Sequence, residues 1–234
     1  MAAGPRSDVV RRGEPGIYHV WTRTVRQAFL CGYDPLTRND YTERRTWIRA
    51  FQERLAAIFA IEIAFRCEMS NHLHLVLKAE PGVVNHWSDE EVITRWLQLK
   101  RLVRSPDGQT VKEITDQEIA CELGKEGRVE ELRLKLSDVS EFMKGLCEYI
   151  ARRANREEGR QGRFFESRFK CRELLDEAAL LTCGIYVDLN EIRAGVAPSP
   201  EASTHTSAHD RIKARQLRKP RKKLKGVKVV AVQV

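Results

Sequence analysis

The segment Cys67-Glu68-Met69-Ser70-Asn71-His72-Leu73-His74-Leu75-Val76-Leu77-Lys78 carries the strongest signal in this chain. Its apolar side chains alternate from residue 73 onward, which predicts a β-strand. Successive side chains of a strand point to opposite faces, so His72 and His74 share one face. The residues that point to the other face and can enter a core are Leu73, Leu75 and Leu77.

The histidine pair has two interpretations. Two imidazoles side by side supply half of a divalent-metal site. They are also compatible with a surface pair or with side chains that make ordinary hydrogen bonds. A second segment, Cys183–Gly195, favours the metal site. It follows a stretch that predicts a helix start with Asp176 as its N-cap. If that helix continues, Tyr186 and Asn190 lie four residues apart on one face.

Tyrosine and asparagine at this spacing suit a catalytic metal site. A phenol becomes a nucleophile once its proton is removed, and an amide oxygen can complete the coordination of a hard cation. The structural alternatives are a buried aromatic ring for Tyr186 and a helix C-cap for Asn190. His19, in an earlier predicted strand, could face the same site, although a core histidine is the interpretation we favour.

These motifs together resemble the HUH-type single-tyrosine transposases, and within them the REP-associated tyrosine transposase branch. The resemblance covers about residues 16 to 200. One departure is Glu191, where the family usually has a proline after the asparagine. The matching blocks are Ile17–Arg23, Asn71–Val76, Gly162–Phe169 and Tyr186–Val196.

The resemblance implies an enzyme that cuts and rejoins single-stranded DNA. It implies Tyr186 as the nucleophile that forms a 5′-phosphotyrosine bond, and His72, His74 and Asn190 as ligands of Mg or Mn. Hairpin-forming or repeated DNA is the expected partner of a monomer or homodimer. Two alternatives stay open: a non-catalytic nucleic-acid-binding protein, and a metal-dependent hydrolase in which water is the nucleophile.

The order of predicted elements indicates an α+β fold. An antiparallel sheet with helices packed on one face, similar to a ferredoxin-like or RRM-like palm, is expected. The predicted divisions are a disordered N-terminus at 1–15, a catalytic domain at 16–200 with an acidic helical excursion at about 104–136, and a basic tail at 201–234.

Positive charge is unevenly distributed. The net charge is +8, but residues 211–234 hold ten of the 41 Lys and Arg and no acid, so the first 210 residues carry 31 basic against 33 acidic side chains. We therefore expect phosphate-binding surface near 152–172 and in the tail. Phenylalanines within 164–169 could stack on bases or belong to the core. The candidate DNA-binding residues are Arg163, Arg168, Lys170, Arg221, Lys222 and Lys223.

Several classes of protein are not indicated by the sequence. No apolar run approaches the roughly 20 residues needed to span a bilayer, and no secretory signal is evident, so a cytoplasmic protein is expected. The six cysteines include no Cys-x-x-Cys pair, which argues against a zinc knuckle or a disulfide framework. No glycine-rich phosphate loop is present, which agrees with a reaction that needs no nucleotide cofactor.

Overall fold

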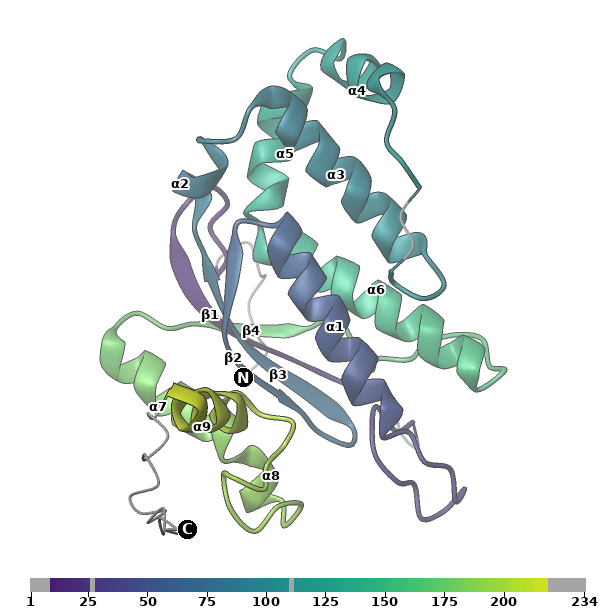
Figure 1. The fold of residues 1–234 in the computed structure, drawn as a ribbon, viewed down its shortest axis with the longest axis vertical. Coiled ribbons are helices and arrows are strands. Elements are labelled where there is room, and N and C mark those ends of the chain that lie inside the picture. The colour runs from purple at the N-terminus through teal and green to yellow at the C-terminus, as the bar shows by residue number, and fades with distance from the viewer. Residues whose placement is uncertain (1–8, 26–27, 110–111, 219–234) are drawn as a thin grey trace, which may run out of the picture.

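A four-stranded antiparallel sheet lies at the centre of the protein (Figure 1). The structure is a computed structural model, and it describes residues 9–25, 28–109 and 112–218. The strand order is β2-β3-β1-β4. The predicted α+β fold with a central antiparallel sheet is confirmed. The strands are β1 (Gly16–Arg23), β2 (Ile61–Glu68), β3 (His72–Ala79) and β4 (Lys170–Glu173).

Strand β3 is paired on both sides. It forms a hairpin with β2, in which Cys67 lies opposite His74, and it pairs with β1, in which Trp21 lies opposite His74. The backbone N–H of Met69 donates to the carbonyl of His72 at 2.9 Å and closes the hairpin. The predicted alternation is confirmed, because the three leucines of β3 are fully buried on one face and the two histidines lie on the other.

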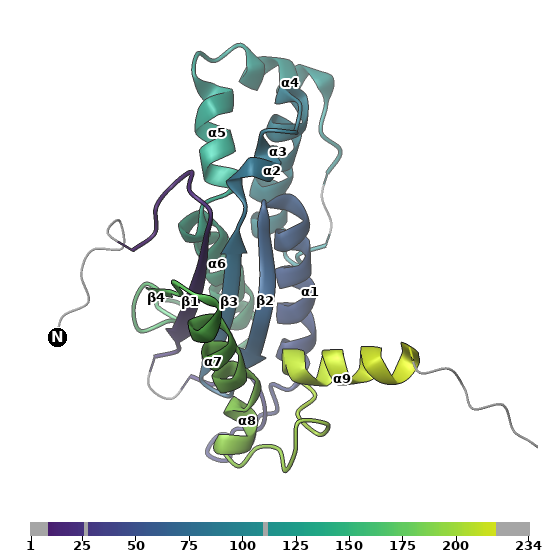
Figure 2. The ribbon, with the colours of Figure 1, turned by 90° about the vertical axis from the view of Figure 1, so that its left-hand side faces the viewer.

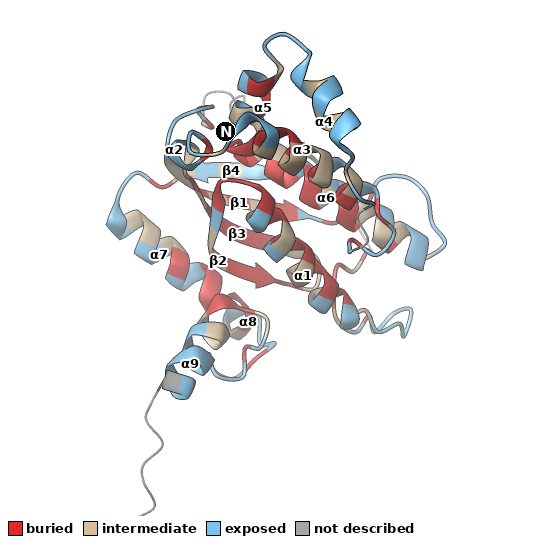
Figure 3. Cartoon of the chain, turned by 45° about the horizontal axis from the view of Figure 1, so that its top comes forward, coloured by how far each residue is buried: buried red, intermediate tan, exposed pale blue. Residues whose placement is uncertain are grey.

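One face of the sheet is covered by long helices. These are α1 (Glu43–Ile58), α3 (Asp89–Arg104) and α6 (Val139–Glu157). Phe51 and Phe142 are among the apolar side chains that they bury against the strand leucines, and burial of each such side chain stabilises the fold by roughly 1.5–3 kcal/mol. Figure 3 shows the buried residues concentrated between the sheet and these helices.

The acidic stretch after α3 is only partly separate from this core. It contains α4 (Asp116–Leu123), which has no buried residue, and α5 (Arg128–Leu136), which buries Val129, Leu132 and Leu136. Thr115 and Glu118 form a capping box at the start of α4. A short helix, α2 (Pro81–Val84), links β3 to α3 and contacts α5. Helix α5 thus completes the core at one end of the sheet.

The opposite face of the sheet also carries helices. Helix α7 (Glu177–Asp188) packs on β2 and β3, followed by α8 (Asn190–Arg193), and α9 (Ser207–Arg218) contacts β2 (Figure 2). The expectation of helices on one face therefore describes α1, α3 and α6 but not α7. Val187 of α7 is buried in a small second core with Cys67, Met69, Val76 and Leu174.

Gly184 allows α7 to approach the sheet closely. A Cβ atom at this position would lie 2.4 Å from the ring carbon Cζ of Phe65 on β2. The missing side chain therefore sets how near the second half of α7 lies to the strands. No helix in the described part of the chain is long and apolar enough to cross a membrane.

Candidate functional site

The histidine pair lies on the sheet face that α7 covers. The ring centroids of His72 and His74 are 4.9 Å apart, with the rings nearly perpendicular. His74 is buried, whereas His72 is half-buried. The central position of β3 fixes both backbones between two neighbouring strands, so the imidazoles are held on a rigid element.

Each histidine has a partner at its Nδ1 atom. The Nε2 atom of His19, on β1, lies 3.0 Å from Nδ1 of His74. The side-chain oxygen of Asn71 lies 2.7 Å from Nδ1 of His72. If each Nδ1 carries the proton and donates it, the Nε2 atoms of His72 and His74 keep a free lone pair, which is the form that ligates a metal.

All three imidazoles are held neutral by their surroundings. Burial lowers the pKa of His74 to about 3, and repulsion by the protonated forms of His72 and His19 acts in the same direction. Burial, with Arg172 nearby, lowers the pKa of His19 to about 4. The pKa of His72 is also lowered, first by burial and then by the charge of Arg23. A neutral imidazole is the protonation state that a metal ligand needs.

Sequence reasoning undervalued His19. It favoured a core histidine, but the side chain faces the same site as the pair. The ring of His19 stacks on Trp21 at 4.9 Å and on His74 at 5.2 Å between centroids. Strand alternation places His19 on one face of β1, but only the pairing of β1 with β3 shows that this is the face of His74.

Tyr186 lies over the histidines from the second half of α7. The helix begins where predicted, because the Asp176 carboxylate accepts a hydrogen bond from the Ala179 N–H at 2.7 Å. The Tyr186 ring meets His74 edge-on at 5.6 Å between centroids, and it is 38% exposed. The guanidinium of Arg193 lies 5.4 Å from the same ring. The phenol therefore borders both the imidazoles and solvent.

Asn190 does not follow Tyr186 on one continuous helix. Helix α7 ends at Asp188, and Leu189 leaves the helical region with φ −91° and ψ 5°, so Asn190 begins the separate α8. Its side chain is buried, and no contact between it and either histidine is found among the interactions of the described residues. The condition of one continuous helix is therefore not met, while a shared face for the two residues and ligation by Asn190 remain predictions.

Glu191 connects this turn to α1 and to the segment that precedes α9. Its buried carboxylate accepts a hydrogen bond from the Ser203 hydroxyl at 2.7 Å and lies 3.7 Å from the Arg45 guanidinium of α1. In the part of the chain that the structure describes, no group of three His, Cys, Asp or Glu side chains could hold a metal ion. The nitrogen atoms that could ligate a metal ion at this site are those of His72 and His74.

The aromatic and basic stretch before α7 divides into buried rings and exposed cations. Phe164, Phe165 and Phe169 are all buried in the main core. They are not available to stack on bases, so the core interpretation of these rings is correct. The chain is irregular before β4, with a single bridge between Phe165 and Thr24, and this lets three close rings reach one core.

The predicted DNA-binding cations have different positions. Arg163 is exposed and donates to the carbonyl of Glu166 at 3.3 Å. Arg168 and Lys170 are exposed, and they lie just before and at the start of the edge strand β4. The three predicted tail residues, Arg221, Lys222 and Lys223, lie outside the described residues.

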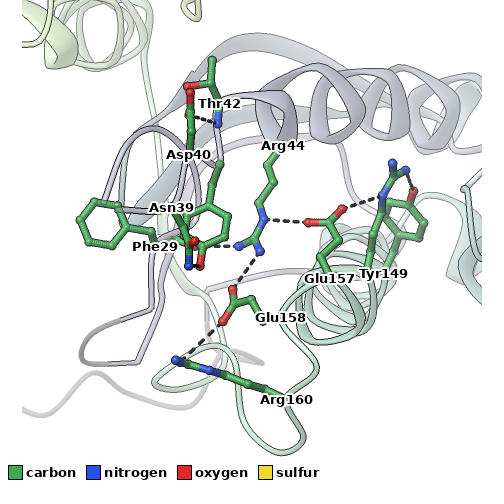
Figure 4. Close-up of polar contacts among 11 residues, drawn as sticks. Phe29, Asn39, Asp40, Thr42, Arg44, Tyr149, Glu157, Glu158 and Arg160 are labelled. Atoms are coloured by element: carbon green, nitrogen blue, oxygen red, sulfur yellow. Dashed lines mark hydrogen bonds and ion pairs between the residues drawn. The ribbon is translucent and has the colours of Figure 1, made fainter. Parts of the chain in front are cut away.

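Much of the earlier part of the basic stretch is paired within the protein. Figure 4 shows buried Arg44 of α1 between Glu157 and Glu158 at the end of α6, at 2.9 Å from each. Arg160 lies 3.6 Å from Glu158, and Arg153 bonds Glu157 and the Tyr149 hydroxyl. Arg44 ties the end of α6 to α1. Arg153 and Arg160 also have acidic partners, so fewer cations over 152–172 are left without an ion pair among the described residues than the sequence suggests.

The arrangement of strands and helices is similar to that of a known protein. A REP-associated tyrosine transposase, solved bound to a REP hairpin, superposes with a TM-score of 0.51 over 93% of this chain and 88% of that chain. The two sequences are 12% identical, so the similarity establishes a transposase-like fold. No protein-family profile and no curated protein sequence matches this chain.

Proposed function

We propose that this protein is a DNA strand transferase that cuts and rejoins single-stranded DNA through a covalent bond to Tyr186. The observation that carries the proposal is the position of the Tyr186 ring, whose centroid lies 5.6 Å from that of His74. His72 lies on the same face of the sheet as His74. These residues come from segments more than one hundred positions apart. The transposase-like fold supports the same class of reaction.

The donor set fits a divalent cation. In this proposal, His72, His74 and Asn190 would hold a Mg or Mn ion, and the Nε2 atoms of the two histidines are free to act as its ligands. A bound cation would polarise the scissile phosphate and stabilise the charge that develops on its oxygens. The remaining steps belong to side chains of the protein.

Tyr186 supplies the nucleophile. Its phenolic oxygen loses a proton to solvent or a nearby base and attacks phosphorus, and the bond from phosphorus to the 3′ oxygen breaks. The departing oxygen takes a proton and becomes a free 3′-hydroxyl, while the 5′ side of the cut stays bonded to the protein. Attack by a 3′-hydroxyl on this phosphotyrosine rejoins the strand. Energy of the phosphodiester is conserved, so no nucleotide cofactor is needed.

The experiment follows which end of the cut DNA stays with the protein. Single-stranded hairpin oligonucleotides labelled at the 3′ or the 5′ end are incubated with Mg or Mn and separated under denaturing conditions. The proposal predicts that only the 3′ label migrates with the protein and that the 5′ label is released. Tyr186→Phe should abolish the adduct and keep DNA binding, whereas Tyr33→Phe, an exposed tyrosine elsewhere, is the matched control.

Two other outcomes identify the alternative functions. Cleavage without an adduct, by both the wild type and Tyr186→Phe, would assign a metal-dependent hydrolase that uses water. Binding without cleavage, unaffected by a chelator, would assign a nucleic-acid-binding protein in which the histidines are structural. Either result would replace the transferase proposal.

A further inference from the structure

A pocket opens beside His72 at the edge of the sheet. It has a volume of about 250 Å³. This is smaller than the roughly 300–1,000 Å³ of most sites for drug-sized ligands, and it suits a single nucleotide better than a longer segment. The pocket is formed by β1, the start of β3 and the chain that enters β4. Its lining residues include Trp21, Arg23, His72, Glu166, Arg168 and Lys170.

Three cations of this pocket are free to bind an anion. Arg23 lies directly opposite His72 across the β1–β3 ladder, and Lys170 lies opposite Trp21 across the β1–β4 ladder. Arg168 lies two residues before Lys170. No ion pair among the described residues involves any of the three, in contrast to Arg44 and its two carboxylate partners. Cations without an ion-pair partner that line one pocket favour the binding of a phosphate group there.

The pocket also offers an aromatic ring. Trp21 is half-buried, and its ring stacks against His19 at 4.9 Å between centroids, which holds it in place. An indole that is fixed on one side and borders a pocket presents a flat apolar surface, on which a nucleobase can stack. Because Trp21 faces His74 across the strand pair, such a base would lie next to the histidine site.

One acidic side chain lies among these cations. The backbone of Glu166 is fixed, since its N–H donates to the Arg23 carbonyl at 2.9 Å and its carbonyl accepts from Arg163. Its side chain is exposed, and none of the ion pairs of the described residues includes it. A carboxylate accepts hydrogen bonds from the exocyclic amine of a base, as from cytosine N4. Thymine has no such amine.

We propose that this pocket binds one nucleotide of the strand to be cut. Its phosphate lies against Arg23, Arg168 and Lys170, its base stacks on Trp21, and its exocyclic amine donates to Glu166. The pocket therefore selects adenine, cytosine or guanine over thymine at one position near the scissile phosphate. The assignment rests on the proposed function, because it takes the substrate to be single-stranded DNA.

The test measures binding without cleavage. Tyr186→Phe protein is titrated with fluorescent single-stranded hairpin oligonucleotides in which each position in turn is made thymine or abasic. We expect one position at which thymine weakens binding by roughly tenfold, the size of one base contact. Adding Glu166→Gln should remove this penalty, because an amide can donate to thymine O4. Glu90→Gln, an exposed acid on α3, is the matched control and should leave it unchanged.

A second variant tests the stacking contact. Trp21→Ala should weaken binding of the intact oligonucleotide by roughly tenfold, and it should add nothing when the critical position is already abasic. Trp21→Phe keeps a ring and should recover most of the affinity, which separates stacking from loss of folding. Equal effects of Trp21→Ala on intact and abasic DNA would overturn the stacking assignment.

The failure of this inference differs from the failure of the proposed function. If the wild type forms the adduct but Glu166→Gln keeps the same preference at every position, the pocket assignment is wrong and the transferase proposal stands. If a Glu166-dependent preference is found while no adduct ever forms, the pocket assignment holds and the transferase proposal fails.

Discussion

His19 and His74 are in contact through their ring nitrogens, with Nε2 of His19 3.0 Å from Nδ1 of His74. The two residues are 55 positions apart and lie on adjacent strands. If His19 accepts the Nδ1 proton of His74, it fixes the tautomer in which His74 offers Nε2 to a metal. His19 then acts as a positioning residue for His74.

Replacing His19 should weaken metal binding. We expect His19→Ala to reduce the affinity for Mn by roughly tenfold to hundredfold, the usual effect of losing a partner of a ligating histidine. His19→Gln keeps an acceptor oxygen and should recover most of the affinity. Isothermal titration with Mn measures both, with His86→Ala, an exposed histidine, as the control. Wild-type affinity in His19→Ala would show that the contact does not orient His74.

The histidine site shows how far the sequence is informative. Strand alternation and helix capping are local, so the common face of His72 and His74 and the N-cap Asp176 could be predicted from neighbouring residues. The interruption of the helix at Leu189 could not be predicted in this way. The next turn is held by buried Glu191, which accepts a hydrogen bond from Ser203 and lies near Arg45. Such a contact depends on the tertiary fold.

Long-range pairing also involves the two glutamates within the basic stretch. Arg44 meets Glu157 and Glu158 from more than one hundred residues away, and nothing in either local sequence indicates it. The pocket beside His72 likewise depends on β4 pairing with β1, which brings Lys170 beside Trp21. The cations that remain unpaired are therefore known only once the strands are assembled.

Helix α7 should depend on the absence of a side chain at residue 184. Gly184→Ala would bring a methyl group against the Phe65 ring and displace Tyr186 from the histidines. We expect less adduct and a free energy of unfolding lower by about 1–3 kcal/mol. Adding Phe65→Leu should restore part of the adduct. The control Ala178→Gly lowers stability on the same helix without a clash, and equal adduct loss in both variants would contradict the positional explanation.

Stability should also depend on pH through Glu68. Burial raises the pKa of this carboxyl from 4.5 to about 6, against the opposing effect of Arg66 and of a hydrogen bond from Gln52. The folded state therefore binds the proton more tightly than the unfolded chain, so the free energy of unfolding falls as pH rises from about 4.5 to 6 and stays lower above it.

Glu68→Gln removes this ionisation and keeps the amide partner. We expect it to raise the free energy of unfolding at pH 7 by roughly 2 kcal/mol and to have little effect at pH 4. Urea unfolding at both pH values measures the change. Glu62→Gln, exposed on the same strand, should show no such difference. If Glu68→Gln raised the free energy of unfolding equally at pH 4 and pH 7, ionisation of Glu68 would not be the cause of the pH dependence.

The basic tail should add affinity without sequence preference. The truncation is placed after Arg218 so that α9 stays intact. Two residues of α9 pair with other elements, Arg211 with Asp188 of α7 and Asp210 with Arg66 of β2. Removing residues 219–234 deletes six Lys and Arg. We expect weaker binding of any single-stranded DNA and a slope of log affinity against log salt that is smaller by roughly 0.7 for each lost phosphate contact. Equal salt slopes for the two proteins would show that the tail takes no part.

The most direct measurement identifies the amino acid that bonds to DNA. Trypsin cuts after Arg172 and Arg193, and the peptide between them contains one tyrosine, Tyr186. Wild-type protein is incubated with single-stranded hairpin DNA and Mn, treated with nuclease and trypsin, and examined by tandem mass spectrometry. We expect a nucleotide phosphate on Tyr186 of this peptide. A nucleotide on any other peptide, or cut DNA with no modified peptide, would contradict it.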